Sequence, residues 1–168
     1  IGKALDFSTS SPAQNTALAW KQGSDMQTTL ARAEAQAQQA LAVDAVENLI
    51  NAYAYYLDEC MPLAAARLFA ETGSNQIPGI GLYTGELRIA QALQMAYCPA
   101  GRQESVLTLH HVLQPVVTVS ADGQSATIVS RLWQIHVAGT EEDYYLLGQL
   151  DAGAVMENGQ WQLVTLNT

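Results

Sequence analysis

The sequence predicts an α+β fold in which helices cover one face of a curved antiparallel sheet. A long segment from residue 26 is rich in Ala, Gln, Glu and Leu, two shorter helical segments follow it, and from Ser105 the chain changes to β-type runs. Helices first and strands second are typical of α+β proteins, because alternating α/β folds mix the two along the chain. The 168 residues suit one domain, and the sequence shows no internal repeat.

The N-terminal part divides into an arm and a long helical segment. Residues 1–25 mix Ser, Thr, Gly and Pro with scattered apolar residues, which predicts a surface arm, and residues 26–168 form the single domain. The domain opens with "MQTTLARAEAQAQQALAVDAVENLINAYAYYLDE", which lacks Gly and Pro and is strongly helical in composition. Within it "DAVE" predicts a fresh helix start, with Asp44 as cap and Glu47 completing a capping box. The buried stripe is expected to be Val46, Ile50, Tyr53 and Leu57.

Two shorter helices are predicted next. Pro62 suits the first turn of "PLAAARLFAE", and Gly73 is expected to end that helix. After a loop, "SNQIPGIGLY", Thr84 is expected to cap the helix "GELRIAQALQMAY".

The remaining chain predicts a long antiparallel meander. Its β-type runs are "SVLTLHHVL", "VVTVS", "SATIVSRLWQIHV", "YYLLGQLDAGAVME" and "QWQLVTL". The intervening turns are "ADGQ", "AGTEED" and "NG", and the last of these is a strong hairpin signal.

Composition excludes several classes of function. The net charge is −9 with only 7 Lys and Arg, so a basic surface for nucleic acid or for anionic membranes is not expected. No apolar run is long enough for a transmembrane helix. No metal-ligand spacing, dinucleotide fingerprint, phosphate loop or nucleophile elbow is present, so we expect no metal and no cofactor. Cys60 and Cys98 are expected to be free thiols, with one disulfide as the alternative, and the compartment stays open.

Four short motifs, in this order, resemble the SnoaL-like family of the nuclear transport factor 2-like superfamily. They are "AVENLINAYAYYLDECMPLAAARLFAE", "GLYTGELRIAQAL", "LHHVLQPVVTVSADGQSATIVS" and "NGQWQL". Together they cover roughly residues 40–166, and the specificity lies in their order rather than in any single motif. The resemblance implies a cone-shaped α+β barrel in which a bent sheet wraps a long first helix and leaves a deep pocket. The superfamily includes scytalone dehydratases, polyketide cyclases and steroid isomerases beside many non-enzymes, so the fold does not define the reaction.

The resemblance to scytalone dehydratases implies a catalytic trio. A gapless overlay places the two active-site histidines of that group on His111 and His136, and the aspartate at the end of its first helix on Asp58. The overlay also shows departures, because the tyrosine before that aspartate is Leu57 here, and its later serine and asparagine fall near Gly148 and Leu150.

An Asp–His pair would explain a carboxylate near the apolar helix stripe. The carboxylate of Asp58 would accept the imidazole N–H of His136, fix its tautomer and raise its basicity. The alternative is that Asp58 caps the helix end or faces water.

Strand alternation allows only one of His110 and His111 to face the pocket. Neither face of that strand is plainly polar, so the choice of His111 comes from the resemblance alone. On the next strand, His136 shares a face with Gln134 and Leu132, a mixed set that suits a pocket wall.

Tyrosines are expected to supply phenol groups at the pocket. Tyr56 and Tyr83 are predicted at its rim, whereas Tyr53 is expected to pack in the core, and one of Tyr144 and Tyr145 lines the cavity. The full set of predicted ligand-binding residues is Tyr56, Tyr83, Leu57, Leu132, Gln134, Gly148 and Leu150.

The sequence therefore predicts a dehydratase, isomerase or cyclase acting on an apolar, oxygenated ring compound by His/Asp acid–base chemistry. His136 would move the proton and His111 would donate to the oxygen on which charge builds. The alternatives are a non-catalytic ligand-binding or assembly domain and a structural subunit of a larger oxygenase. The resemblance also implies a homodimer through the outer sheet face, with Trp133 and Ile135 as contacts.

Overall fold

The computed structural model describes residues 12–139 and 143–168 of the chain. It divides into two units, residues 1–38 and 39–168. Of the predicted arm at residues 1–25, residues 12–25 belong to the first helix, and residues 1–11 lie outside the described residues. The compact second unit begins at Gln39 rather than at residue 26, and the predicted domain boundary stays a prediction.

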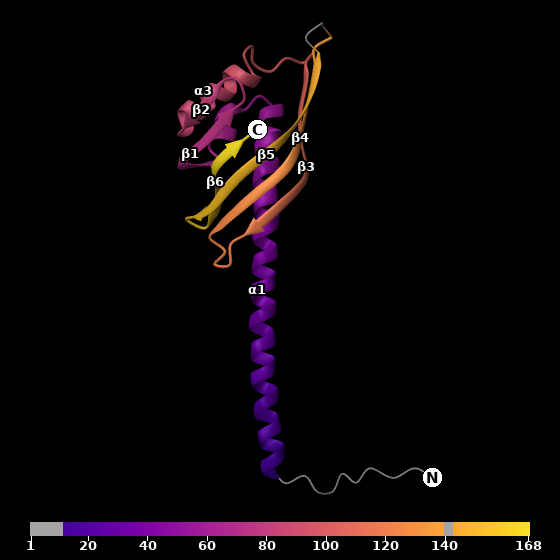
Figure 1. The fold of residues 1–168 in the computed structure, drawn as a ribbon, viewed down its shortest axis with the longest axis vertical. Coiled ribbons are helices and arrows are strands. Elements are labelled where there is room, and N and C mark those ends of the chain that lie inside the picture. The colour runs from indigo at the N-terminus through magenta and orange to yellow at the C-terminus, as the bar shows by residue number, and fades with distance from the viewer. Residues whose placement is uncertain (1–11, 140–142) are drawn as a thin grey trace, which may run out of the picture. The chain divides into compact units, whose positions relative to one another are not determined.

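The order of elements is helical first and mostly β afterwards, as the α+β prediction requires (Figure 1). The helices and strands are α1 (Pro12–Asp58), α2 (Pro62–Ala66), β1 (Phe69–Ile77), β2 (Gly81–Thr84), α3 (Glu86–Tyr97), β3 (Leu107–Val119), β4 (Ser125–Val137), β5 (Tyr144–Glu157) and β6 (Gln160–Asn167). None of the helices in the described part of the chain is both long enough and apolar enough to cross a bilayer.

The six strands form one sheet in the order β2-β1-β6-β5-β4-β3. The last four strands make the predicted antiparallel meander, which Figure 1 shows running side by side across the C-terminal part of α1. β1 joins the free edge of β6 in parallel, and β2 pairs antiparallel with β1. This arrangement confirms the predicted fold class.

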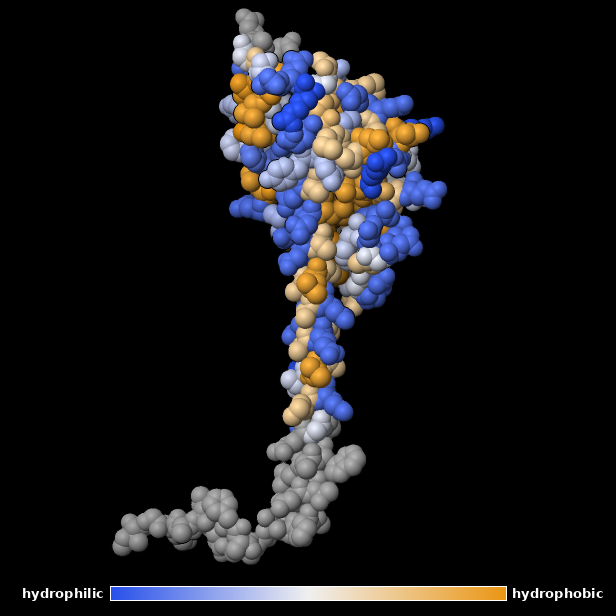
Figure 2. All heavy atoms as spheres, turned by 180° about the vertical axis from the view of Figure 1, so that it is seen from behind, coloured by the Kyte–Doolittle hydropathy of each residue, from blue (hydrophilic) through white to orange (hydrophobic). Residues whose placement is uncertain are grey.

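The core lies between the end of α1 and the inner face of the sheet. The predicted helix stripe is confirmed, since Val46, Ile50, Tyr53 and Leu57 are all buried. They pack with residues of α3, among them Ile89 and Leu93, and with inward-facing apolar residues of the sheet. Those of the sheet include Phe69, Ile128, Leu132, Leu150, Leu163 and Leu166. Figure 2 shows that the surface seen from behind mixes polar side chains with separate apolar groups.

Three helix boundaries differ from the predictions. α1 runs through Asp44 without a break, because no Gly or Pro interrupts the segment and the exposed Asp44 is tolerated within a helix. Pro62 begins α2 as expected, but α2 ends at Ala66. Thr84 ends β2, and Gly85, with φ of 86°, precedes the first residue of α3.

Gly73 does not end a helix but lies in β1, a strand that the sequence analysis missed. A Cβ at this position would lie 2.7 Å from the carbonyl oxygen of Leu163 on β6 and 2.9 Å from that of Ala70. The glycine is therefore required by the close approach of two backbones. The predicted loop "SNQIPGIGLY" is instead the end of β1, a short turn and most of β2.

The two predicted runs before and after Pro115 form one strand, β3, with a bulge between them. Gln114 has φ of 52°, and the pairing of β3 with β4 shifts register between Leu113 and Val116. The "NG" hairpin is confirmed, since Asn158 and Gly159 both have positive φ, as a two-residue hairpin turn needs.

Candidate active site

Asp58, the last residue of α1, contacts His110 near the start of β3. One carboxylate oxygen, Oδ1, lies 2.8 Å from the backbone nitrogen of His110 and 2.8 Å from its ring Nδ1. His110 is 5% exposed, and the side chain of Asp58 is also largely buried. A buried carboxylate needs hydrogen-bond donors, and this pairing provides two.

His110 rather than His111 faces the helices. Thr108, His110 and Val112 lie on the inner face of β3, opposite the inward residues of β4, whereas His111 is exposed on the outer face. The ring of His111 lies 5.9 Å from that of Trp133, which is its partner across the strands. The predicted inward position of His111 is therefore wrong.

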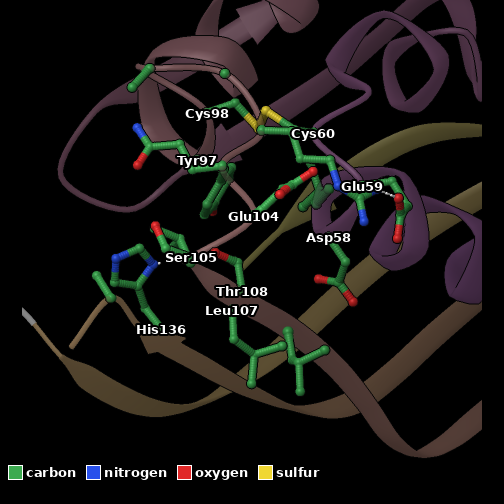
Figure 3. Close-up of a pocket in the computed structure, with 18 of the residues that line it drawn as sticks. Asp58, Glu59, Cys60, Tyr97, Cys98, Glu104, Ser105, Leu107, Thr108 and His136 are labelled. Atoms are coloured by element: carbon green, nitrogen blue, oxygen red, sulfur yellow. Dashed lines mark hydrogen bonds and ion pairs between the residues drawn. A yellow bond between two sulfur atoms is a disulfide. The ribbon is translucent and has the colours of Figure 1, made fainter.

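The predicted contact between Asp58 and His136 is also wrong, because Asp58 pairs with an imidazole of β3 and not of β4. His136 does face inward, where its Nδ1 lies 3.2 Å from Oγ1 of Thr108 and its ring stacks on Tyr144 at 5.2 Å. Figure 3 shows His136 and Asp58 on opposite sides of a pocket, with Thr108 and Leu107 between them. The sheet twist carries the end of β4 away from the end of α1.

That pocket, the outer pocket, has a volume of about 790 Å³. The end of α1, the loop of residues 98–106, the start of β3 and the end of β4 form its walls. Its ionisable lining residues are Asp58, Glu59, Tyr97, Arg102, Glu104 and His136. A pocket of this size suits a small molecule.

A second, inner cavity lies deeper against the sheet and has a volume of only about 10 Å³, the room that one water molecule needs. Its lining is mostly apolar with a few polar groups. The lining residues are Tyr53, Ala54, Leu57, Tyr97, His110, Val112, Leu132, Gln134, Leu150 and Thr168.

The predicted ligand-binding residues fall into three groups. Leu57, Leu132, Gln134 and Leu150 line the inner cavity. Gly148 is paired with Leu132, and a Cβ there would meet nothing within 4 Å. Tyr56 and Tyr83 pack against the core and line neither space. Binding by these residues stays a prediction.

Tyr97, the last residue of α3, is a site residue that the sequence analysis missed. Its ring meets that of His110 edge-on, with centroids 5.0 Å apart and an angle of 89° between the planes. Burial raises the pKa of its phenol, and hydrogen bonds with the side chains of Gln134 and Thr168 oppose that increase. No motif in the sequence links a residue at the end of this helix with a histidine on β3.

Two links join the loop of residues 98–106 to the end of α1. Cys60 and Cys98 form a disulfide, which corrects the expectation of free thiols and agrees with the alternative. Arg102 and Glu59 form an ion pair beside it, and Figure 3 shows the disulfide bordering the outer pocket. Sequence spacing did not decide this pairing, because it depends on α3 packing beside α2.

Within the described residues, no group of three or more His, Cys, Asp or Glu side chains is arranged to hold a metal ion. The expectation that the site works without a metal or cofactor stays a prediction.

Among known protein families, the SnoaL-like domain matches residues 38–167 of the chain. Among solved structures, a putative scytalone dehydratase from Novosphingobium aromaticivorans is 25% identical, with a TM-score of 0.65, and the match covers 79% of this chain and 85% of that one. No curated protein matches the chain.

Two further solved structures share the fold. An NTF2-like protein with a cystatin-like fold, also from Novosphingobium aromaticivorans, is 20% identical with a TM-score of 0.63, covering 83% of this chain and 86% of that one. The structure of LinA is 15% identical with a TM-score of 0.68, covering 79% and 88%. These matches confirm the fold that the sequence motifs implied.

Proposed function

The chain belongs to the SnoaL-like domain family, and on that premise we propose that it is a small-molecule lyase or isomerase of the dehydratase, isomerase or cyclase kind. The similarity to a putative scytalone dehydratase supports this class of reaction. The observation that carries the proposal is the buried pair of Asp58 and His110.

His110 is proposed as the group that moves the proton. A carboxylate only accepts hydrogen bonds, so the ring nitrogen beside Asp58, Nδ1, carries a proton. The other nitrogen, Nε2, then holds a lone pair and can remove a proton from carbon. The resulting imidazolium is stabilised by Asp58 and returns the proton, either to a second carbon or to a departing hydroxyl group. Asp58 acts through the imidazole and is a positioning residue.

The ligand is proposed to be a neutral, mostly apolar ring compound that carries oxygen. The inner cavity is walled mainly by apolar side chains, with Gln134 and Tyr97 as polar groups that suit a carbonyl or hydroxyl oxygen. Carboxylates of Asp58, Glu59 and Glu104 line the outer pocket and disfavour an anion. His136, at the far wall of the outer pocket, is proposed to contact a polar end of the ligand.

A non-catalytic ligand-binding domain is the second candidate. It is favoured by the small volume of the inner cavity and by the apolar Leu57 and Leu150 where the scytalone dehydratase pattern has polar groups.

Proton transfer to and from carbon distinguishes the two candidates without knowledge of the natural product. Neutral cyclic ketones and β-hydroxyketones, 1-tetralone among them, would be incubated with the protein in D₂O and followed by NMR for deuterium uptake next to the carbonyl. We expect uptake with the wild type and with His111→Gln, and a loss of about 10²–10⁴-fold with His110→Gln. The His111 variant is a matched control because the two residues are neighbours on opposite faces of β3.

Equal uptake with the two variants would contradict the role of His110. Binding of these ketones with no deuterium uptake by the wild type would favour the binding domain.

The protein is also proposed to form a homodimer through the outer sheet face. Trp133 is 38% exposed and Leu147, its partner on β5, is 73% exposed, and Tyr145 beside them is 77% exposed. Large apolar side chains together on one face are typical of interfaces. Sedimentation equilibrium would show a dimer for the wild type and a shift toward monomer for Leu147→Glu; a monomeric wild type would contradict this.

A further inference from the structure

Within the described residues, Leu57 and Tyr97 line both the outer pocket and the inner cavity, and no other residue does. Asp58 lines only the outer pocket, and His110 lines only the inner cavity. The hydrogen bond between them therefore connects two separate spaces. A molecule in the outer pocket contacts the carboxylate, but the imidazole lies behind Leu57 and Tyr97.

Leu57 and Tyr97 together form a partition between the outer pocket and the inner cavity, and they differ in how firmly they are held. Leu57 is 4% exposed and belongs to the core stripe of α1, so its displacement would disturb the packing of the helix. Tyr97 is half-buried and ends α3, directly before the loop that forms one wall of the outer pocket. Its ring can turn about side-chain torsions without moving the helix. Tyr97 is therefore the movable part of the partition.

Neighbouring side chains surround the ring of Tyr97 in its present position. Gln134 and Thr168 line the inner cavity together with Tyr97, and their side chains lower the pKa of its phenol, against the effect of burial. The edge of its ring packs against His110. In this position the inner cavity holds about 10 Å³, whereas the space on the other side of the ring holds about 790 Å³.

We propose that Tyr97 is a gate and specificity-determining residue, whose ring must turn aside before a ligand reaches His110 and whose bulk limits the size of that ligand. When the ring turns, the inner cavity joins the outer pocket and the imidazole becomes accessible from it. The contact of the ring with His110, and the polar side chains of Gln134 and Thr168 around the inner cavity, favour the closed position. This inference rests on the proposed function in taking His110 as the group that a ligand must reach.

The rate at which a reagent acylates each histidine measures how accessible its imidazole is, and the measurement needs no natural ligand. Diethyl pyrocarbonate transfers its ethoxycarbonyl group to a neutral imidazole nitrogen and releases ethanol and carbon dioxide. Peptide mass spectrometry would give the rate at each histidine in the full chain. His136 faces the outer pocket and serves as the internal reference. We expect His110 to react more slowly than His136 in the wild type.

Variants of Tyr97 distinguish the effect of its hydroxyl on the acylation rate at His110 from the effect of its ring. Tyr97→Phe removes the hydroxyl and should raise the rate at His110 by about fivefold, the factor for one net hydrogen bond. Tyr97→Ala removes the ring and should raise it further, while the rate at His136 is unchanged in both. Tyr55→Phe is the control, because Tyr55 is 70% exposed on α1. Circular dichroism would confirm folding, and Tyr97→Leu replaces Tyr97→Ala if the latter unfolds.

Reagents of two sizes test the selection of ligands. The wild type should favour diethyl pyrocarbonate over the bulkier di-tert-butyl pyrocarbonate at His110 more strongly than at His136, and Tyr97→Ala should remove that difference. The gate is refuted if His110 reacts as fast as His136 in the wild type, or if its rate is the same in all Tyr97 variants. Neither result depends on catalysis, so the failure of the proposed reaction and the failure of the gate are distinguishable.

Discussion

One oxygen of Asp58 accepts both a backbone and a ring hydrogen bond from His110, each at 2.8 Å. The two bonds fix the position of β3 relative to the end of α1 and also the orientation of the imidazole. Because the backbone contact does not depend on the side chain at position 110, Asp58 has a structural role as well as its proposed role in proton transfer.

Replacement of Asp58 by Asn should lower proton transfer by His110. The amide oxygen of Asn can still accept both hydrogen bonds, but it stabilises an imidazolium less well than a carboxylate does. We expect deuterium uptake by the ketone to fall by about 10²–10⁴-fold. Glu59→Gln is the control, since Glu59 is the next residue and pairs with Arg102 instead. Equal uptake by the wild type and by Asp58→Asn would show that the carboxylate does not assist His110.

The protein should lose stability in alkali through Tyr53. Burial raises the pKa of this phenol, Tyr97 adds to the increase, and a hydrogen bond from Asn75 opposes it. A raised pKa in the folded state means that the stabilisation is fully present below the pKa of the unfolded chain, about 10, and is lost as the pH rises above it. Urea unfolding between about pH 9 and pH 11 should therefore show a falling free energy of unfolding.

Tyr53→Phe should be less sensitive to alkali than the wild type, while Tyr55→Phe should behave as the wild type does. At neutral pH, Tyr53→Phe should be less stable by about 1–3 kcal/mol, because the side-chain nitrogen of the buried Asn75 loses its partner. If the free energy of unfolding falls as steeply with pH in Tyr53→Phe as in the wild type, a group other than Tyr53 causes the effect.

Reduction of the disulfide should destabilise the fold. Cys60 and Cys98 are separated by 38 positions, and closing a loop of that length removes chain entropy worth about 4 kcal/mol from the unfolded state. Denaturant unfolding with and without dithiothreitol measures the difference. The Cys60→Ser/Cys98→Ser variant should match the reduced wild type and be unaffected by the reductant. A reductant effect of the same size in that variant would contradict the assignment.

Gly73→Ala should destabilise the pairing of β1 with β6. The added Cβ would lie 2.7 Å from a backbone oxygen of Leu163, and neither backbone can move freely. We expect a loss of about 1–3 kcal/mol in urea unfolding. Gly148→Ala is the matched control in another strand, because its Cβ would meet nothing within 4 Å. If Gly148→Ala lowers the free energy of unfolding as much as Gly73→Ala does, the effect is not due to the close approach of the backbones at Gly73.

The sequence predicts the parts of the fold that have a regular pattern. The stripe ending at Leu57 and the four-stranded meander both have clear periodicity, and both predictions are confirmed. β1 was missed because its sequence, "FAETGSNQI", contains Gly, Ser and Asn, which favour turns. It forms a strand because β6 offers a free edge and because the buried Asn75 bonds to Tyr53, and both are tertiary causes.

The candidate site was predicted only in part for a similar reason. Asp58 was located by its place in the family motif, which ends with the first long helix. The choice between His110 and His111 depends on strand parity, and both faces of β3 carry apolar residues. Tyr97 reaches His110 through the packing of α3, for which the sequence contains no signal.

The bulge at Gln114 changes which positions of β3 face inward. Before it the inward residues have even numbers, as at Thr108 and His110, and after it they have odd numbers, as at Val117 and Val119. Loss or gain of one amino acid at this point during evolution, with the later half of the strand held in place, would turn His111 inward in place of His110. Neither imidazole would need to be replaced. The identity of the inward imidazole is therefore set by the number of residues in the bulge, because histidines occupy both neighbouring positions.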